Sequence, residues 1–161
     1  MAEELDYNDI MAEAARDAVQ YVHREYQFAL DYSEESVAEM EKSLTHIHRV
    51  LVTENTDPID PKMVVTISNW YGAYLGEVFR RHHGGDWGID NRDPEAPAFE
   101  VKYNDLGMAF PSRVFHRIMG GKENDINEYY REISKKVMKL EIKEEDEKWG
   151  DLFENQNPVY K

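Results

Sequence analysis

The sequence predicts an α+β fold: a helical hairpin plus a glycine-stepped helix packed on a small three-stranded antiparallel meander, closed by C-terminal helices. Two changes of hydrophobic period predict this class. Apolar residues recur every three or four positions from about residue 8 to residue 83, as on the buried face of a helix. They then alternate with polar residues, as in a strand, before the helical period returns near the C-terminus.

A chain of 161 residues fits a single domain. We divide it into an acidic helical hairpin (1–60), an α+β core (61–141) and a charged C-terminal tail (142–161). The sequence has no cysteine, which excludes disulfides, thiolate nucleophiles and zinc–thiolate or iron–sulfur sites and fits a reducing compartment. It has no basic leader and no apolar run of about 18 residues, so we expect a cytoplasmic protein.

The net charge of −14 is concentrated in the first third of the chain. Residues 1–60 hold 15 acidic and 4 basic residues, a net charge of 4 − 15 = −11. Such a field opposes the phosphates of nucleic acid and of anionic lipid, so we expect neither a nucleic-acid nor a membrane partner. A basic protein is a partner compatible with this charge, and a solvated acidic surface explains it without any partner.

The hairpin is predicted from two amphipathic segments. The first runs from about Asn8 to Leu30, and the second begins after Ser33, a candidate N-cap with Glu34 and Glu35 in the first turn. The second segment carries a narrow apolar seam suited to an antiparallel partner, formed by Val37, Met40, Leu44, Ile47 and Leu51.

The glycine-stepped helix is predicted from Pro61, which follows the capping residue Asp60, to about residue 83, where two glycines end it. Gly72 and Gly76 lie one turn apart inside it. A glycine within a helix costs about 0.8–1 kcal/mol relative to alanine, so both positions need an offsetting contact. We interpret them as a groove into which another part of the backbone packs closely.

The meander is predicted from alternation around Trp87 and Ile89, then over residues 98–103, with "NDLG" as a turn into a third strand at 108–110. A short helix should begin at Ser112, and a last helix should run from about 124 to 141. The rest reads as a charged, loop-like tail, whose residues Trp149, Leu152 and Phe153 are candidates for packing on the body.

The end of the third helix is the candidate ligand-binding corner. Its charged and aromatic residues converge on one helix end and the start of a strand, where a pocket would form. A helical ion pair from Glu77 to Arg80 and Arg81 explains part of the set without a function. The candidate residues are Glu77, Arg80, Arg81, His82, His83, Asp86 and Trp87.

No metal, cofactor or catalytic residue is predicted. The pair His46 and His48 and the pair His82 and His83 lack the three- or four-residue spacing that places two imidazoles on one helix face. The sequence also has no G-x-S-x-G elbow, no P-loop and no G-x-G-x-x-G after a strand.

The order of motifs resembles a group of uncharacterised bacterial domains of unknown function. The resemblance rests on "WYGAYLGEVFRRHHGGDWGI", a strand such as "FEVKY" and then "FPSRVFHRIMGGKENDINEYY", and it covers approximately residues 64–133. The matching positions are Gly72, Gly76, Glu77, Gly85 and Trp87. The resemblance implies a glycine-stepped helix leading into a Trp-bearing strand, and it implies no activity.

Three functions remain open from the sequence. The leading one is a non-enzymatic protein-interaction module with the glycine-stepped helix and the meander as its scaffold. The second is an acidic, immunity-type inhibitor of a basic toxin or nuclease, in which charge speeds the encounter. The third is a small enzyme at the corner, with Glu77 or a histidine as the base.

Overall fold

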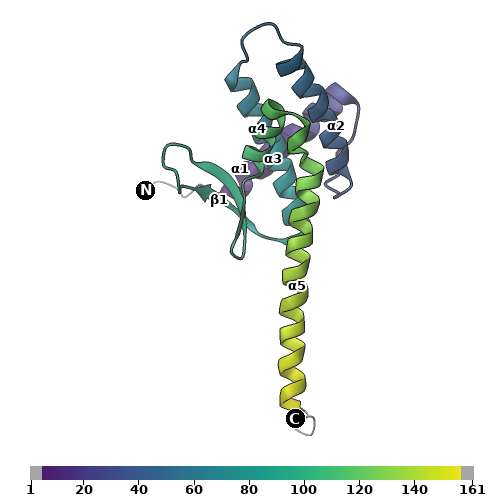
Figure 1. Cartoon of the computed structure of the whole chain (residues 1–161), viewed down its shortest axis with the longest axis vertical. Helices are drawn as coiled ribbons and strands as arrows, with labels where there is room; N and C mark the ends of the chain where they lie inside the picture. The colour runs from purple at the N-terminus through teal and green to yellow at the C-terminus, as the bar shows by residue number, and fades with distance from the viewer. Residues whose placement is uncertain (1–4, 157–161) are drawn as a thin grey trace.

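Five α-helices and a three-stranded antiparallel sheet form the chain in the computed structural model, which describes the backbone of residues 5–156 and the side chains of residues 5–150. The α+β class predicted from the sequence is confirmed, and Figure 1 shows a helical body with the sheet at its side and one helix extending from it. The elements are α1 (Tyr7–Tyr26), α2 (Ser36–His48), the π-helical turn η1 (Arg49–Thr53), α3 (Pro61–His83), β1 (Asp86–Asp90), β2 (Ala98–Tyr103), β3 (Leu106–Met108), α4 (Phe110–Gly120), the short η2 (Lys122–Asn124) and α5 (Ile126–Gln156).

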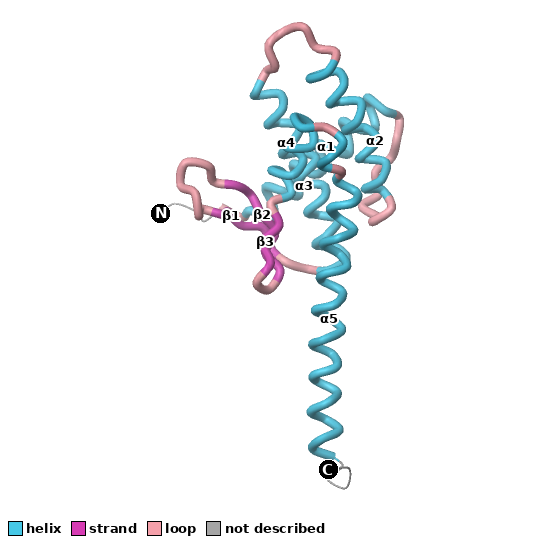
Figure 2. Tube along the Cα trace, in the orientation of Figure 1, coloured by secondary structure: helices cyan, strands magenta, loops and turns pink. Residues whose placement is uncertain are grey.

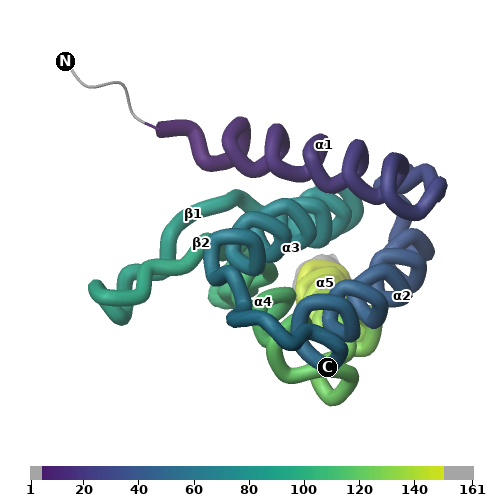
Figure 3. The backbone as a smooth tube through the Cα atoms, turned by 90° about the horizontal axis from the view of Figure 1, so that it is seen from above, coloured from purple at the N-terminus to yellow at the C-terminus, as the bar shows by residue number. Residues whose placement is uncertain are grey.

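The first helix packs mainly on α3 rather than on α2, which corrects the predicted hairpin (Figure 3). Ala15 and Ala18 are fully buried in α1, and their small side chains permit a close approach to α3. Helix α1 also ends earlier than predicted, because Gln27 adopts the left-handed conformation (φ 53°) and its N–H bonds to His23 O. Ser33 lies one turn before the start of α2, and its Oγ accepts the N–H of Ser36 (3.2 Å), while Glu35 and not Ser33 occupies the N-cap position.

The glycines of α3 are close-packing positions, as predicted. A Cβ at Gly72 would lie 2.3 Å from Pro111 Cα, and a Cβ at Gly76 would lie 2.0 Å from Trp87 Cζ2. Both distances are far below van der Waals contact, so a side chain at either position would push α4 or β1 away. The two glycines therefore hold α4 and the sheet against the centre of α3.

The meander forms in the order β1-β2-β3, with Trp87 opposite Val101 and Lys102 opposite Gly107. The third strand lies two residues earlier than predicted. A tight turn at Asn104 (φ 50°) starts it early, and Phe110 and Pro111 already belong to the first turn of α4.

A buried ion pair ties α2 to α4. Arg117 is 1% exposed, and its Nε donates to Glu41 Oε1 (2.7 Å). The other oxygen of Glu41 accepts the N–H of Ile126 (2.9 Å), the first residue of α5. Burial raises the pKa of Glu41, and the hydrogen bonds from Ile126 and Arg117 oppose that rise. One carboxylate thus joins three helices.

The last helix is longer than predicted. It continues to Gln156, beyond the boundary expected near residue 141, so the segment predicted as a loop-like tail is helical as far as the structure describes it (Figure 2). The segment lacks proline up to residue 156 and is rich in glutamate and lysine, which are strong helix formers. Trp149 is half exposed rather than packed on the body, and the side chains of Leu152 and Phe153 lie outside the described residues.

Candidate functional site

The corner predicted at the end of α3 contains side chains that bind one another. The buried Glu77 carboxylate accepts hydrogen bonds from Arg80 Nη1 (2.7 Å) and Trp87 Nε1 (3.2 Å). Arg80 Nε donates at the same time to Gly85 O (3.0 Å). Because the indole also fills the space beside Gly76, these contacts fix β1 on α3.

Asn8 completes this part of the corner from α1. Its Nδ2 donates to Asp86 Oδ1 (3.2 Å), and its Oδ1 accepts the backbone N–H of Trp87 (2.8 Å). No motif in the sequence links Asn8 to residues so far along the chain. The contact follows from the antiparallel packing of α1 on α3, which the sequence analysis did not predict.

Arg81 and His82 turn toward a different neighbour. The guanidinium of Arg81 stacks on the ring of Tyr32, with Cζ 3.5 Å from the ring centroid. His82 Nε2 lies 3.1 Å from Tyr32 O. Both contacts hold the chain between α1 and α2 against the last turn of α3.

His83 lies in a third environment, between two carboxylates. Its Nε2 is 3.5 Å from Glu34 Oε2 but forms no hydrogen bond within the described residues, and its Nδ1 is 3.7 Å from Glu141 Oε1. Its ring is tilted by 39° against the Phe79 ring, with the two centroids 4.9 Å apart. Glu34 also accepts a hydrogen bond from the Tyr130 hydroxyl (2.8 Å). Burial raises the pKa of Tyr130, so the hydroxyl remains a donor at neutral pH. This cluster joins α3 to the start of α2 and to α5.

The predicted residues thus form three sets of contacts between elements. In the described part of the chain, no group of three or more histidine or acidic side chains is arranged to hold a metal ion. Among the helices that the structure describes, none is both long enough and apolar enough to span a bilayer.

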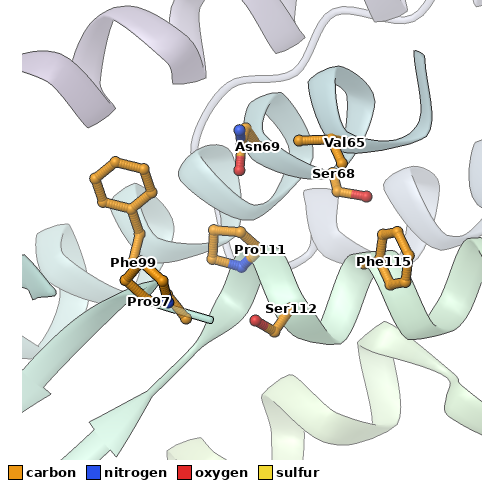
Figure 4. A pocket seen from close by; sticks show the side chains of 9 residues that line it. Val65, Ser68, Asn69, Pro97, Phe99, Pro111, Ser112 and Phe115 are labelled. Carbon is orange, nitrogen blue, oxygen red and sulfur yellow. The ribbon is translucent and has the colours of Figure 1, made fainter. Parts of the chain in front are cut away.

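A pocket of about 310 Å³ lies between α3 and the start of α4 (Figure 4). Ser68 is buried at its edge, and its hydroxyl has no hydrogen-bond partner among the described residues. The residues that line the pocket carry no formal charge, and its polar groups come from Ser68, Asn69 and Ser112. The lining residues are Val65, Ser68, Asn69, Pro97, Ala98, Phe99, Pro111, Ser112 and Phe115.

The second half of α5 carries the most exposed apolar surface that follows a helical pattern. Met138, Ile142 and Trp149 are 52%, 57% and 51% exposed. They lie four and seven residues apart, which places them within about 40° of one another around the helix. We call this row of three residues the apolar stripe.

The charge pattern of α5 explains why its second half leaves the body. The face packed on the body carries apolar residues at alternating steps of four and three, ending at Val137 and the partly exposed Leu140. The next positions of the same face are Glu144 and Glu147. Charged residues there end the apolar contact, and the helix continues away from the body (Figure 1).

The turn between β2 and β3 holds the helix where it departs. The Tyr103 hydroxyl donates to Glu141 Oε1 (3.1 Å), and Asn104 Nδ2 donates to Glu144 Oε1 (3.4 Å). Burial raises the pKa of Tyr103, and the hydrogen bond to Glu141 raises it further, so this hydroxyl stays protonated at neutral pH. The meander thereby sets the direction in which the apolar stripe is presented.

A surface groove of about 490 Å³ continues the apolar stripe toward the body. It lies between α5 and the start of α2, and Met138 belongs to both the stripe and the groove. The groove is lined by Glu34, Glu35, Ala38, Asn127, Tyr130, Arg131, Ser134, Lys135 and Met138. The stripe and the groove together form one continuous surface along α5.

This surface was not predicted from the sequence, although the helical spacing of Met138, Ile142 and Trp149 is a signal for it. Comparison of the chain with protein-family models, with curated protein sequences and with solved structures finds no match to any of them.

Proposed function

We propose that the chain is a non-enzymatic protein-interaction module. Helix α3 and the meander form its scaffold, and the second half of α5 presents the contact surface. The observation that carries this proposal is the apolar stripe, whose three large side chains are each about half exposed on a helix that leaves the body.

The energetics support a contact role for the stripe. Full burial of one large apolar side chain stabilises a structure by about 1.5–3 kcal/mol, and these three side chains leave much of that gain unused within the chain. Apolar residues at spacings of four and seven are the pattern by which a helix binds an apolar partner surface. Trp149 is of the residue type that most often dominates such contacts.

The test is a comparison of two positions on the same helix. A photo-crosslinking amino acid would replace Ile142, on the stripe, or Glu147, which lies on the opposite face and is also exposed. We expect discrete crosslinked species from position 142, and none from position 147, in cells that produce the chain naturally. Equal labelling at the two positions, or none at either, would overturn the proposal.

A further inference from the structure

We infer that the apolar stripe binds a second copy of this chain, with the two α5 helices antiparallel. This inference rests on the proposed function and names the partner of the same surface. It is carried by the charged residues that border the stripe. Lys139 and Asp146 lie on one side of it, and Glu141 and Lys148 lie on the other, each about 60–100° around the helix from its centre.

An antiparallel pair brings opposite charges together on both sides. In the register that we infer, Met138 of one copy faces Trp149 of the second. In an antiparallel pair, residues on one flank of the stripe meet residues on the same flank of the second copy, so Lys139 lies beside Asp146 of the second copy. On the other side Glu141 lies beside Lys148 of the second copy. Two-fold symmetry repeats both contacts, which makes four opposite-charge contacts around one apolar seam.

A parallel pair would bring like charges together. Glu145, the polar residue in the middle of the stripe, would then face its own copy across the seam. Glu141 would lie beside Asp146 of the second copy, which is also repulsive. In the antiparallel pair Glu145 lies beside Ile142 of the second copy instead, so charge selects one orientation.

The groove extends the same interface toward each body. In this register residues 152–156 of the second copy run along residues 131–135 of the first, where Arg131 and Lys135 line the groove. Segment 144–156 of α5 is acidic and segment 131–143 is predominantly basic, so each copy places its acidic half against the basic half of the other. A second copy of the chain therefore has the charge pattern that complements this surface.

Sedimentation equilibrium of the purified full chain tests the pairing. We expect a reversible dimer. Trp149→Ala should weaken it by about thirtyfold or more, as expected for a large aromatic side chain that is buried in a contact. Asp146→Lys should raise the dissociation constant of the dimer roughly tenfold, because the substitution replaces two attractive contacts by repulsive ones. The double variant Lys139→Glu with Asp146→Lys should restore the dimer, whereas Lys143→Glu, which lies outside the seam, should weaken it much less than Asp146→Lys does. Circular dichroism checks that each variant is folded.

The orientation of the two helices can be measured separately, from the distance between spin labels on the two copies. The chain contains no cysteine, so one introduced cysteine carries a single label. Labels at Lys143→Cys should lie close together across the dimer, whereas labels at Lys136→Cys should lie about 20 Å farther apart. Equal separations at the two positions, or tighter association of the Asp146→Lys variant, would show a parallel pair and overturn the inference.

The outcomes separate this inference from the proposed function. A chain that remains monomeric at millimolar concentration, yet crosslinks to a different protein from position 142, keeps the interaction module and excludes the second copy as its partner. A chain that neither associates nor crosslinks from that position loses both proposals.

Discussion

Helix α3 and the second half of α5 differ in how their apolar side chains are covered. Tyr71 and Leu75 of α3 are fully buried, whereas Met138, Ile142 and Trp149 of α5 are about half exposed. The interior of α3 is covered on several sides, by α1, α4 and the sheet. The body therefore completes its core without the second half of α5, whose apolar side chains remain about half exposed.

The glycines of the two helices show the same difference. A Cβ at Gly72 would collide with the backbone of Pro111, whereas a Cβ at Gly150 would have no described atom within 4 Å. In α3 the glycine is required by packing, and in α5 it is not. Changes in the body should therefore alter stability, while changes in the second half of α5 should alter association.

The largest effect is expected from the buried ion pair of the body. Arg117→Met leaves the buried Glu41 carboxylate without its cation and should lower the free energy of unfolding by about 3–5 kcal/mol, measured by urea denaturation. Arg92→Met, which breaks the exposed pair with Asp90, is the matched control and should cause no measurable change. An Arg117→Met variant as stable as the parent would show that the pair does not hold α2, α4 and α5 together.

The next effect separates the two helices directly. Gly72→Ala should lower the free energy of unfolding by about 1–3 kcal/mol, because the clash with Pro111 outweighs the helix preference of alanine. Gly150→Ala should leave the unfolding transition unchanged and slightly increase the helix signal in circular dichroism. Equal behaviour of the two variants would remove the distinction between the helices.

A smaller effect is expected from two of the three tryptophans, Trp87 and Trp149. Trp87→Phe removes the donor to Glu77 and part of the ring that fills the space beside Gly76, which should cost about 1–2 kcal/mol. Trp149→Phe should not change the stability of the body. Fluorescence quenching by iodide, compared between the parent chain and each Phe variant so that Trp70 is a common background, provides an independent check. The Trp149 indole should be quenched in the monomer, and the Trp87 indole should be protected.

The smallest effect concerns pH and is absent near neutrality. Burial raises the pKa of both Tyr71 and Tyr74 above the ordinary value. The folded state therefore retains these protons to higher pH than the unfolded state, so the contribution of the two tyrosines to stability is constant below about pH 10 and falls as the pH rises above it. Tyr71→Phe should make that fall shallower in urea denaturation at alkaline pH. If the free energy of unfolding falls with pH as steeply in Tyr71→Phe as in the parent chain, the raised pKa of Tyr71 is contradicted.

Much of the body followed from local patterns in the sequence. The start of α3 is set by Asp60, whose carboxylate accepts the N–H of Lys62 (3.0 Å), and its end by two glycines with positive φ. These signals act within one turn of the chain. The packing role of Gly72 and Gly76 also followed, because a glycine that weakens a helix requires a compensating contact.

The tertiary partners did not follow from such patterns. Packing of α1 on α3 depends on how the surface around small residues such as Ala15 fits the surface of another helix. The hydrophobic period of a helix shows which face is buried, but it does not show which helix covers that face. The charged segment after residue 141 was predicted as a loop because its apolar period ends, although its residues favour a helix without any packing. The side chains of Arg81, His82 and His83 do not point into one common site. They contact residues that are distant in the sequence, such as Tyr32 and Glu34, and local patterns do not predict such contacts.

The most direct test of the central claim is amide hydrogen exchange of residues 138–150, measured at several concentrations of the chain. If this segment is the contact surface for a second copy, its exchange should be fast in dilute solution and should slow as the concentration rises, while the interior of α3 stays protected throughout. Exchange in residues 138–150 that does not change with concentration would contradict the claim.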